Sequence, residues 1–180
     1  MARPIELIPL VCLNCSTPIP ASSNEMAWVC AQCGQGMALD VQEGLTPLQV
    51  NYAEGILPNS RGRPYWVAEG QVNLQRDVYR SSGKSAQEAV QFWSGPRRFL
   101  IPAYTLPQED LLAQTTLFLL QPPALKAGSQ APFEPVTLSM EDIQPVAEFI
   151  VMVIEAGRKD MLKNIRFTLD LSTPSLWILP

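Results

Sequence analysis

The sequence of 180 residues contains no histidine. This absence excludes imidazole acid–base catalysis, Ser-His-Asp and Cys-His nucleophile pairs, and metal or haem sites that need a histidine ligand. Charged residues are also scarce, at 17% of the chain, against a usual share of about 25%. No arrangement of Asp, Glu, Lys, Tyr, Ser or Thr typical of an active site stands out. The sequence therefore predicts a protein that is not an enzyme.

Long apolar runs are missing as well. The longest uninterrupted run is Phe149–Ile154, whereas a helix that crosses a bilayer needs about 18 apolar residues. The N-terminal apolar stretch is broken by Glu6 and Pro9 and is not followed by the small-residue cleavage site of a secretory signal peptide. We therefore expect a cytoplasmic protein. In such a reducing compartment, paired cysteines more often bind a metal than form disulfides.

The four cysteines form two pairs with the same internal spacing. Two residues separate Cys12 from Cys15 and Cys30 from Cys33, and fourteen residues lie between the pairs. Two residues between thiolates allow one tight turn to direct both sulfurs at one ion, and two such turns complete a tetrahedron. Because four cysteines leave no ligand position for water or substrate, such a site is structural. We predict one structural Zn²⁺ bound by these four residues, with a tetrathiolate iron centre or two disulfides as the alternatives.

Residues 10–42 resemble the zinc β-ribbon superfamily. They combine the two C-x2-C turns with expected strands at residues 25–29 and 37–41. Gly34 follows the second pair and can adopt the left-handed conformation that closes such a turn, whereas Ser16 would be strained at the equivalent position of the first turn. Because rubredoxin-type iron proteins use the same turns, an iron electron carrier remains an alternative function.

Charge is distributed unevenly along the chain. Residues 1–58 carry one basic residue against five acidic ones, so the ribbon has almost no Lys or Arg with which to bind phosphate. Residues 59–98 carry seven basic residues against three acidic ones. This segment suggests, as an alternative function, a nucleic-acid or ribosome-associated protein that binds an anionic partner, with nearby aromatic rings as stacking groups. The candidate residues are Arg61, Arg63, Arg76, Arg80, Arg97 and Arg98, with Tyr65, Trp66, Tyr79, Phe92 and Trp93 as the aromatic groups.

The remainder of the chain predicts a small mixed α+β domain. Residues 45–64 are rich in Pro, Gly and Asn, which favours a linker between a ribbon at 1–44 and a domain at 65–180. Residues 65–79 alternate apolar and polar side chains, as in a long strand or a hairpin. A short helix is expected from Ser85, followed by a strand over residues 97–104.

A weak internal repeat predicts two strand–helix units in this domain. Thr105–Leu111 and Thr137–Ile143 share the pattern Thr-Leu-x-x-Glu-Asp followed by a branched aliphatic residue. The shared carboxylates suit the first turn of a helix, where they complement the helix dipole. We expect helices at 111–120 and 143–156. Strands are then expected at residues 165–171 and 176–179, the last of which forms either a sheet strand or an exposed edge for another chain.

These features together predict a non-enzymatic, zinc-binding accessory or scaffolding subunit that contacts protein partners in a larger assembly. The closed metal site, the absence of histidine and the apolar C-terminal residues motivate this hypothesis. Beyond the ribbon, the Tyr65-Trp66 and Phe92-Trp93 pairs and the segment Gly95–Phe99 resemble those of bacterial proteins that place a zinc ribbon before a small α+β domain. That resemblance implies an architecture and no activity.

Overall fold

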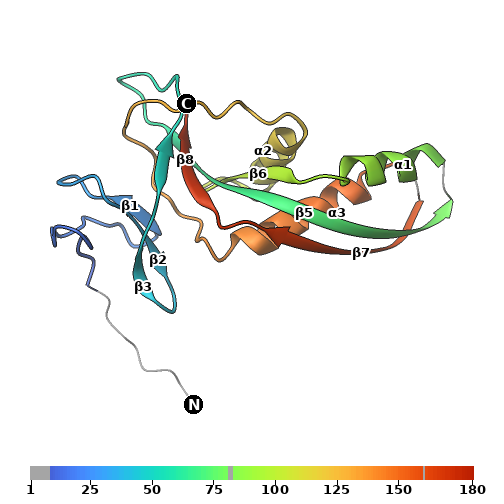
Figure 1. Cartoon of the computed structure of the whole chain (residues 1–180), viewed down its shortest axis with the longest axis horizontal. Coiled ribbons are helices and arrows are strands. Elements are labelled where there is room, and N and C mark those ends of the chain that lie inside the picture. The colour runs from blue at the N-terminus through green and yellow to red at the C-terminus, as the bar shows by residue number, and fades with distance from the viewer. Residues whose placement is uncertain (1–8, 81–82, 160) are drawn as a thin grey trace, which may run out of the picture.

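A computed structural model describes residues 9–80, 83–159 and 161–180 of the chain. Residues 1–8, which hold most of the segment considered for a signal peptide, lie outside the described residues. The fold is α+β, as predicted, with one small and one larger sheet and helices packed on the larger one (Figure 1). In the described ranges, no helix has the length and apolar character needed to cross a bilayer.

The first sheet belongs to what we call the N-terminal module, residues 9–47. Its strands are β1 (Ala27–Val29), β2 (Gly36–Asp40) and β3 (Gly44–Pro47), paired antiparallel in the order β1-β2-β3. The first two confirm the strands predicted from the sequence, although β1 starts two residues later than expected. The β2–β3 turn is held by Asp40, whose carboxylate accepts hydrogen bonds from the backbone of Gln42 and Glu43.

The second sheet is built around one long strand, β5 (Arg63–Arg80). The main strand order is β4-β8-β5-β6, and β7 pairs with β5 beyond the end of β8. The other strands are β4 (Val50–Tyr52), β6 (Arg97–Pro102), β7 (Met161–Leu171) and β8 (Ser175–Leu179). Strand β8 lies between β4 and β5. The C-terminal residues therefore form an interior sheet strand, which was one of the two predicted outcomes.

The sequence of β5 explains why its two ends are buried differently. Residues 65–68 read Tyr-Trp-Val-Ala and are buried on both faces, as expected for a continuous apolar run. From residue 72 onward the strand alternates, so that Val72 and Leu74 pack on the main core while Asn73 is exposed. Gly70 lies between these two parts of the strand. A Cβ at this position would lie 2.6 Å from the Phe99 ring and 2.8 Å from Leu171, so there is no room for a side chain.

Three helices pack against this sheet: α1 (Gly83–Phe92), α2 (Gln108–Leu120) and α3 (Ile143–Ala156). The bounds of α3 are those predicted, whereas α1 and α2 start earlier than expected, at Gly83 and Gln108. The first strand–helix unit is β6 followed by α2. In the second unit, α3 follows an irregular segment with single bridges at Phe133 and Val136. The two copies of the repeat meet in space, because Thr105 Oγ1 lies 3.3 Å from Thr137 Oγ1.

The N-terminal module is packed onto the rest of the chain. Met26 donates a backbone hydrogen bond of 2.8 Å to the carbonyl of Val136. Ala27, Ala38 and Leu48 belong to the same buried cluster as residues of α3 and β5. The segment 45–64, which the sequence favours as a linker, contains the end of β3 and all of β4. The domain division at these residues stays a prediction, but the module and the body share one core.

Candidate metal centre

The two cysteine turns have the same backbone geometry. In the first turn, Ser16 N–H donates to the Cys12 carbonyl and Cys12 N–H donates to the Thr17 carbonyl, both at 2.9 Å. In the second turn, Gly34 and Gln35 make the equivalent bonds with Cys30, also at 2.9 Å. Each turn thus aims two cysteine side chains to the same side, which is the arrangement that a C-x2-C metal site requires.

Both turns are closed by a residue with positive φ. Gly34 has a φ of 75°, and Ser16, at the matching position, has a φ of 58°. The sequence prediction that the first turn is the less ideal one is therefore confirmed. A serine pays a steric penalty in this region of about 1–2 kcal/mol, whereas a glycine does not.

Replacing Ser16 by glycine should therefore stabilise the protein, and Gly34→Ala should destabilise it, each by about 1 kcal/mol. A Cβ on Gly34 would meet no atom within 4 Å, so the effect of Gly34→Ala reports the backbone strain and not a steric clash. Gly95→Ala is the matched control, because a Cβ there also meets nothing within 4 Å and no positive φ is recorded for Gly95. Chemical unfolding measures the stability of all three variants. Equal changes in stability for Gly34→Ala and Gly95→Ala would contradict the strain argument.

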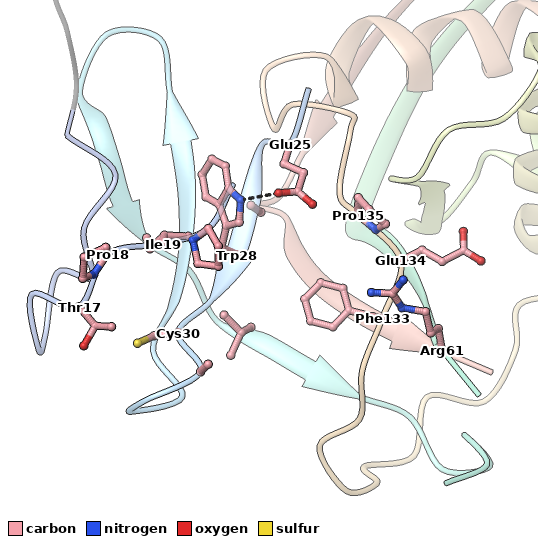
Figure 2. A pocket seen from close by; sticks show the side chains of 14 residues that line it. Thr17, Pro18, Ile19, Glu25, Trp28, Cys30, Arg61, Phe133, Glu134 and Pro135 are labelled. Atoms are coloured by element: carbon pink, nitrogen blue, oxygen red, sulfur yellow. Dashed lines mark hydrogen bonds between the residues drawn. The ribbon is translucent and has the colours of Figure 1, made fainter. Parts of the chain in front are cut away.

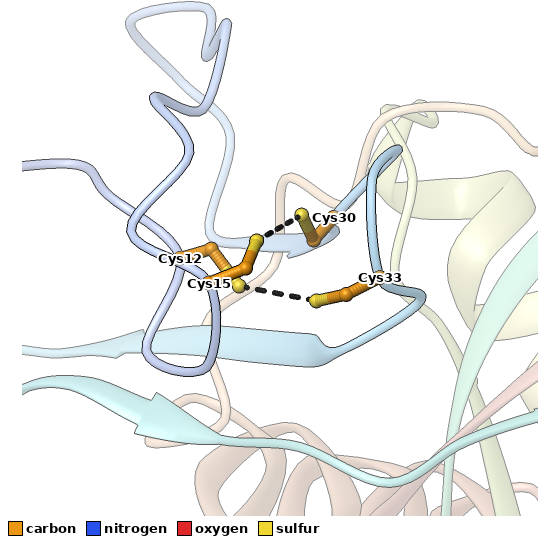
Figure 3. Close-up of side chains that lie close together, drawn as sticks. All are labelled: Cys12, Cys15, Cys30 and Cys33. Carbon is orange, nitrogen blue, oxygen red and sulfur yellow. Dashed lines mark hydrogen bonds between the residues drawn. The ribbon is translucent and has the colours of Figure 1, made fainter.

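The four sulfur atoms lie within 4.8 Å of one another (Figure 3). The Sγ atoms of Cys12 and Cys33 are 3.5 Å apart, and those of Cys15 and Cys30 are 3.6 Å apart. A tetrahedral ion with metal–sulfur bonds of about 2.3 Å separates its ligands by about 3.8 Å, so the arrangement fits a metal. It does not fit two disulfides, whose sulfurs lie about 2.05 Å apart, and all four thiols are free.

The local environment favours the thiolate form of Cys15. Cys15 Sγ lies 3.2 Å from Thr17 Oγ1, and the hydrogen bonds with Thr17 lower the pKa of the Cys15 thiol to about 6. The backbone N–H of Asn14 donates to Cys12 Sγ at 3.4 Å. Thiolates, rather than thiols, are the form that binds metals. Cys12 and Cys30 are buried over Met37 and Ile19, while Cys15 and Cys33 are exposed, so the site lies at the surface of the module.

No protein-family model, no curated protein and no solved structure matches this chain. The assignment of the site therefore depends on its own geometry. Four sulfurs at tetrahedral spacing, held by two equivalent turns, can bind a metal ion without any further ligand from the chain.

The six arginines predicted for an anionic partner do not share one environment. Arg76 and Arg97 are engaged internally: Arg76 Nε lies 2.8 Å from a Glu155 carboxylate oxygen, and Arg97 donates to the Phe92 carbonyl and stacks on its ring. Arg98 pairs with Glu69 at the surface at 2.7 Å. Arg61 and Arg63 are exposed, and the side chain of Arg80 lies outside the described residues. Among the described residues, the structure therefore does not gather three of these arginines into one surface patch that a partner could contact.

The five aromatic residues proposed for stacking are mostly core residues. Tyr65, Trp66 and Trp93 are buried, and Phe92 is half-buried beneath Arg97, so only Tyr79 presents a largely exposed ring. Binding of an anionic partner stays a prediction, and nothing in these contacts favours it as a function.

Sequence reasoning missed a buried ion cluster around Glu155. This carboxylate is fully buried and accepts hydrogen bonds from Trp93 Nε1 at 2.7 Å and from Arg158 Nε at 2.8 Å, in addition to its ion pair with Arg76. One sequence feature pointed to it. Arg76 lies at an even-numbered position of β5, like Val72 and Leu74, so its side chain had to face inward and needed an acidic partner.

Proposed function

We propose that the four cysteines bind one structural Zn²⁺ and that the N-terminal module is a zinc ribbon. The observation that carries this proposal is the spacing of the four sulfurs, with pairs 3.5 and 3.6 Å apart across the two turns. Such a site contributes its binding energy to folding, because the unfolded chain does not hold the four ligands together. A cytoplasmic location belongs to the proposal, since a reducing compartment keeps the thiols available for metal.

We further propose that the protein is non-enzymatic and serves as an accessory or scaffolding subunit that binds a protein partner. Support comes from large apolar side chains that remain exposed on two neighbouring helices. Leu117 and Leu120 on α2 are 50% and 53% exposed, and Phe149 and Met152 on α3 are 38% and 41% exposed. These four residues, the apolar helix surface, lie in pairs three residues apart, so each pair shares one side of its helix. Exposed apolar pairs of this kind favour a protein contact.

Purification from a native lysate tests this role. We expect the full chain to elute with a stoichiometric protein partner, and the double variant Leu117→Ser/Leu120→Ser to lose that partner while keeping its metal. The double variant Val41→Ser/Val90→Ser is the control, because these apolar side chains are even more exposed, at 66% and 67%, but lie outside α2 and α3. A clean monomer on gentle size-exclusion chromatography, or a partner retained by the α2 variant and by Phe149→Ser/Met152→Ser, would refute the proposal.

A further inference from the structure

A cavity of about 200 Å³ lies where the N-terminal module meets the segment before α3 (Figure 2). One wall comes from the module, with Ile19 and Trp28, and the facing wall comes from Phe133 and Pro135. Sites for drug-sized ligands occupy roughly 300–1,000 Å³, so this cavity selects a small molecule. It is separate from the proposed metal function, although Cys30 contributes to its lining.

Much of the wall of this cavity is apolar. Trp28 is buried and Phe133 is half-buried, and three prolines, Pro18, Pro20 and Pro135, contribute to the lining. Proline fixes its own φ angle, so these segments lose little freedom when a ligand binds. A preformed apolar cavity with a few placed polar groups is the usual form of a small-molecule site.

A carboxylate is fixed on one side of the cavity. Glu25 Oε2 accepts hydrogen bonds from Ser22 N at 2.8 Å and from Trp28 Nε1 at 3.0 Å. Both bonds use the same oxygen, so within the described residues Oε1 has no donor. Figure 2 shows this carboxylate turned toward the space between the Trp28 and Phe133 side chains. The two bonds orient Glu25 and leave one of its oxygens available to a cationic group of a ligand.

A guanidinium group lies on the opposite side of the same cavity. Arg61 is exposed, and the ion pairs among the residues that the structure describes do not include it. Its guanidinium lies beside Phe133 in Figure 2, while the carboxylate of the adjacent Glu134 points away from the cavity. The cavity therefore has an acceptor for a cation on one side, a donor for an anion on the other, and apolar walls between them.

We propose that this cavity binds a small zwitterion with an apolar body, of which a free aliphatic amino acid is the simplest case. Its ammonium group would pair with Glu25 Oε1, its carboxylate with Arg61, and its side chain would lie between Trp28 and Phe133. This arrangement satisfies both charges with one molecule, whereas an amine alone or a carboxylate alone leaves one of the two protein charges without a partner.

Calorimetric titration of the metal-loaded full chain tests the proposal with four probes. L-leucine carries both charges, L-leucinamide lacks the carboxylate, and N-acetyl-L-leucine lacks the ammonium group. We expect saturable binding of leucine and a loss of about tenfold in affinity for each analogue. Leucyl-leucine distinguishes the two sources of such a ligand: tighter binding of the dipeptide than of leucine would assign the same two-charge site to a short peptide.

Variants of Glu25 and Arg61 test which residue binds which charge of the ligand. Glu25→Gln keeps an acceptor for Trp28 and Ser22, and it should lower the affinity for leucine by about tenfold without changing the affinity for N-acetyl-L-leucine. Arg61→Gln should lower the affinity for leucine without changing the affinity for leucinamide. Glu54→Gln and Arg63→Gln are controls, because these exposed residues do not line the cavity. Metal content and thermal midpoint verify that each variant is folded. No saturable binding of any probe by the wild-type protein, or analogues that bind as well as leucine, would overturn the proposal.

Discussion

Replacement of Cys12 by serine is expected to abolish metal binding and to unfold the N-terminal module. Cys12 is buried and is one of the four cysteines that could hold a metal ion, and the three remaining thiolates would not complete a closed site. Structural zinc contributes on the order of 10 kcal/mol to the folding of small zinc domains. Because Ala27 and Ala38 of the module belong to the main buried cluster, the rest of the chain should lose stability as well.

Metal analysis and hydrogen exchange measure these two effects. In Cys12→Ser, amides of residues 10–47 should exchange rapidly, and the body should unfold at a lower temperature than in the wild type. Ser23→Ala is the control, since Ser23 is exposed and lies between the two turns. A Cys12→Ser protein that keeps one metal ion per chain and full protection of residues 10–47 would show that the cysteines do not hold the module together.

Replacement of Glu155 by alanine is expected to destabilise the protein by about 3–5 kcal/mol, the usual effect of removing one partner from a buried ion pair. The carboxylate is fully buried, and its partner Arg76 has only 6% of its side chain exposed. Without Glu155, the buried Arg76 guanidinium loses this ion pair, and Trp93 Nε1 loses its acceptor. The cluster connects α3, β5 and the end of α1, so its loss should loosen the long β5–β7 pair (Figure 1).

The exposed pair of Glu69 and Arg98 supplies the control for this prediction. Their side chains are 49% and 42% exposed, so Glu69→Ala should change stability by no more than about 1 kcal/mol. Urea unfolding measures the loss of stability in both variants. Glu155→Gln keeps an acceptor for Trp93, so its loss of stability should lie between those of Glu155→Ala and Glu69→Ala. If Glu155→Ala and Glu69→Ala were equally mild, the buried cluster would have no special role in stability.

Local patterns in the sequence predicted the local parts of the fold. Helix α3 (Ile143–Ala156) has the predicted bounds, because the Glu-Asp pair of the repeat that precedes it is a local feature of the sequence. Just before this helix, Ser139 Oγ donates to the Asp142 carboxylate at 2.7 Å. The close grouping of the four cysteines, the candidate metal site, was predictable for the same reason. Two C-x2-C turns specify their own geometry, including the strained Ser16.

Long-range pairing was not predictable in the same way. Strand β8 pairs parallel with β4 and antiparallel with β5, and no local pattern selects these partners. The basic segment is a second example. Counting charges placed Arg76 and Arg98 in one group, but strand alternation directs Arg76 into the core and leaves Arg98 at the surface. The cavity between Glu25 and Arg61 also depends on how the module packs on the body, which composition does not reveal.

Elemental analysis of the protein, purified without added metal, tests the central claim most directly. The account predicts one zinc ion per chain, no absorbance in the visible, and loss of the metal in Cys12→Ser. Iron with a visible absorbance band would instead assign the site to an electron carrier of the rubredoxin type. A full-length, folded protein that contains no metal and four free thiols would contradict the account.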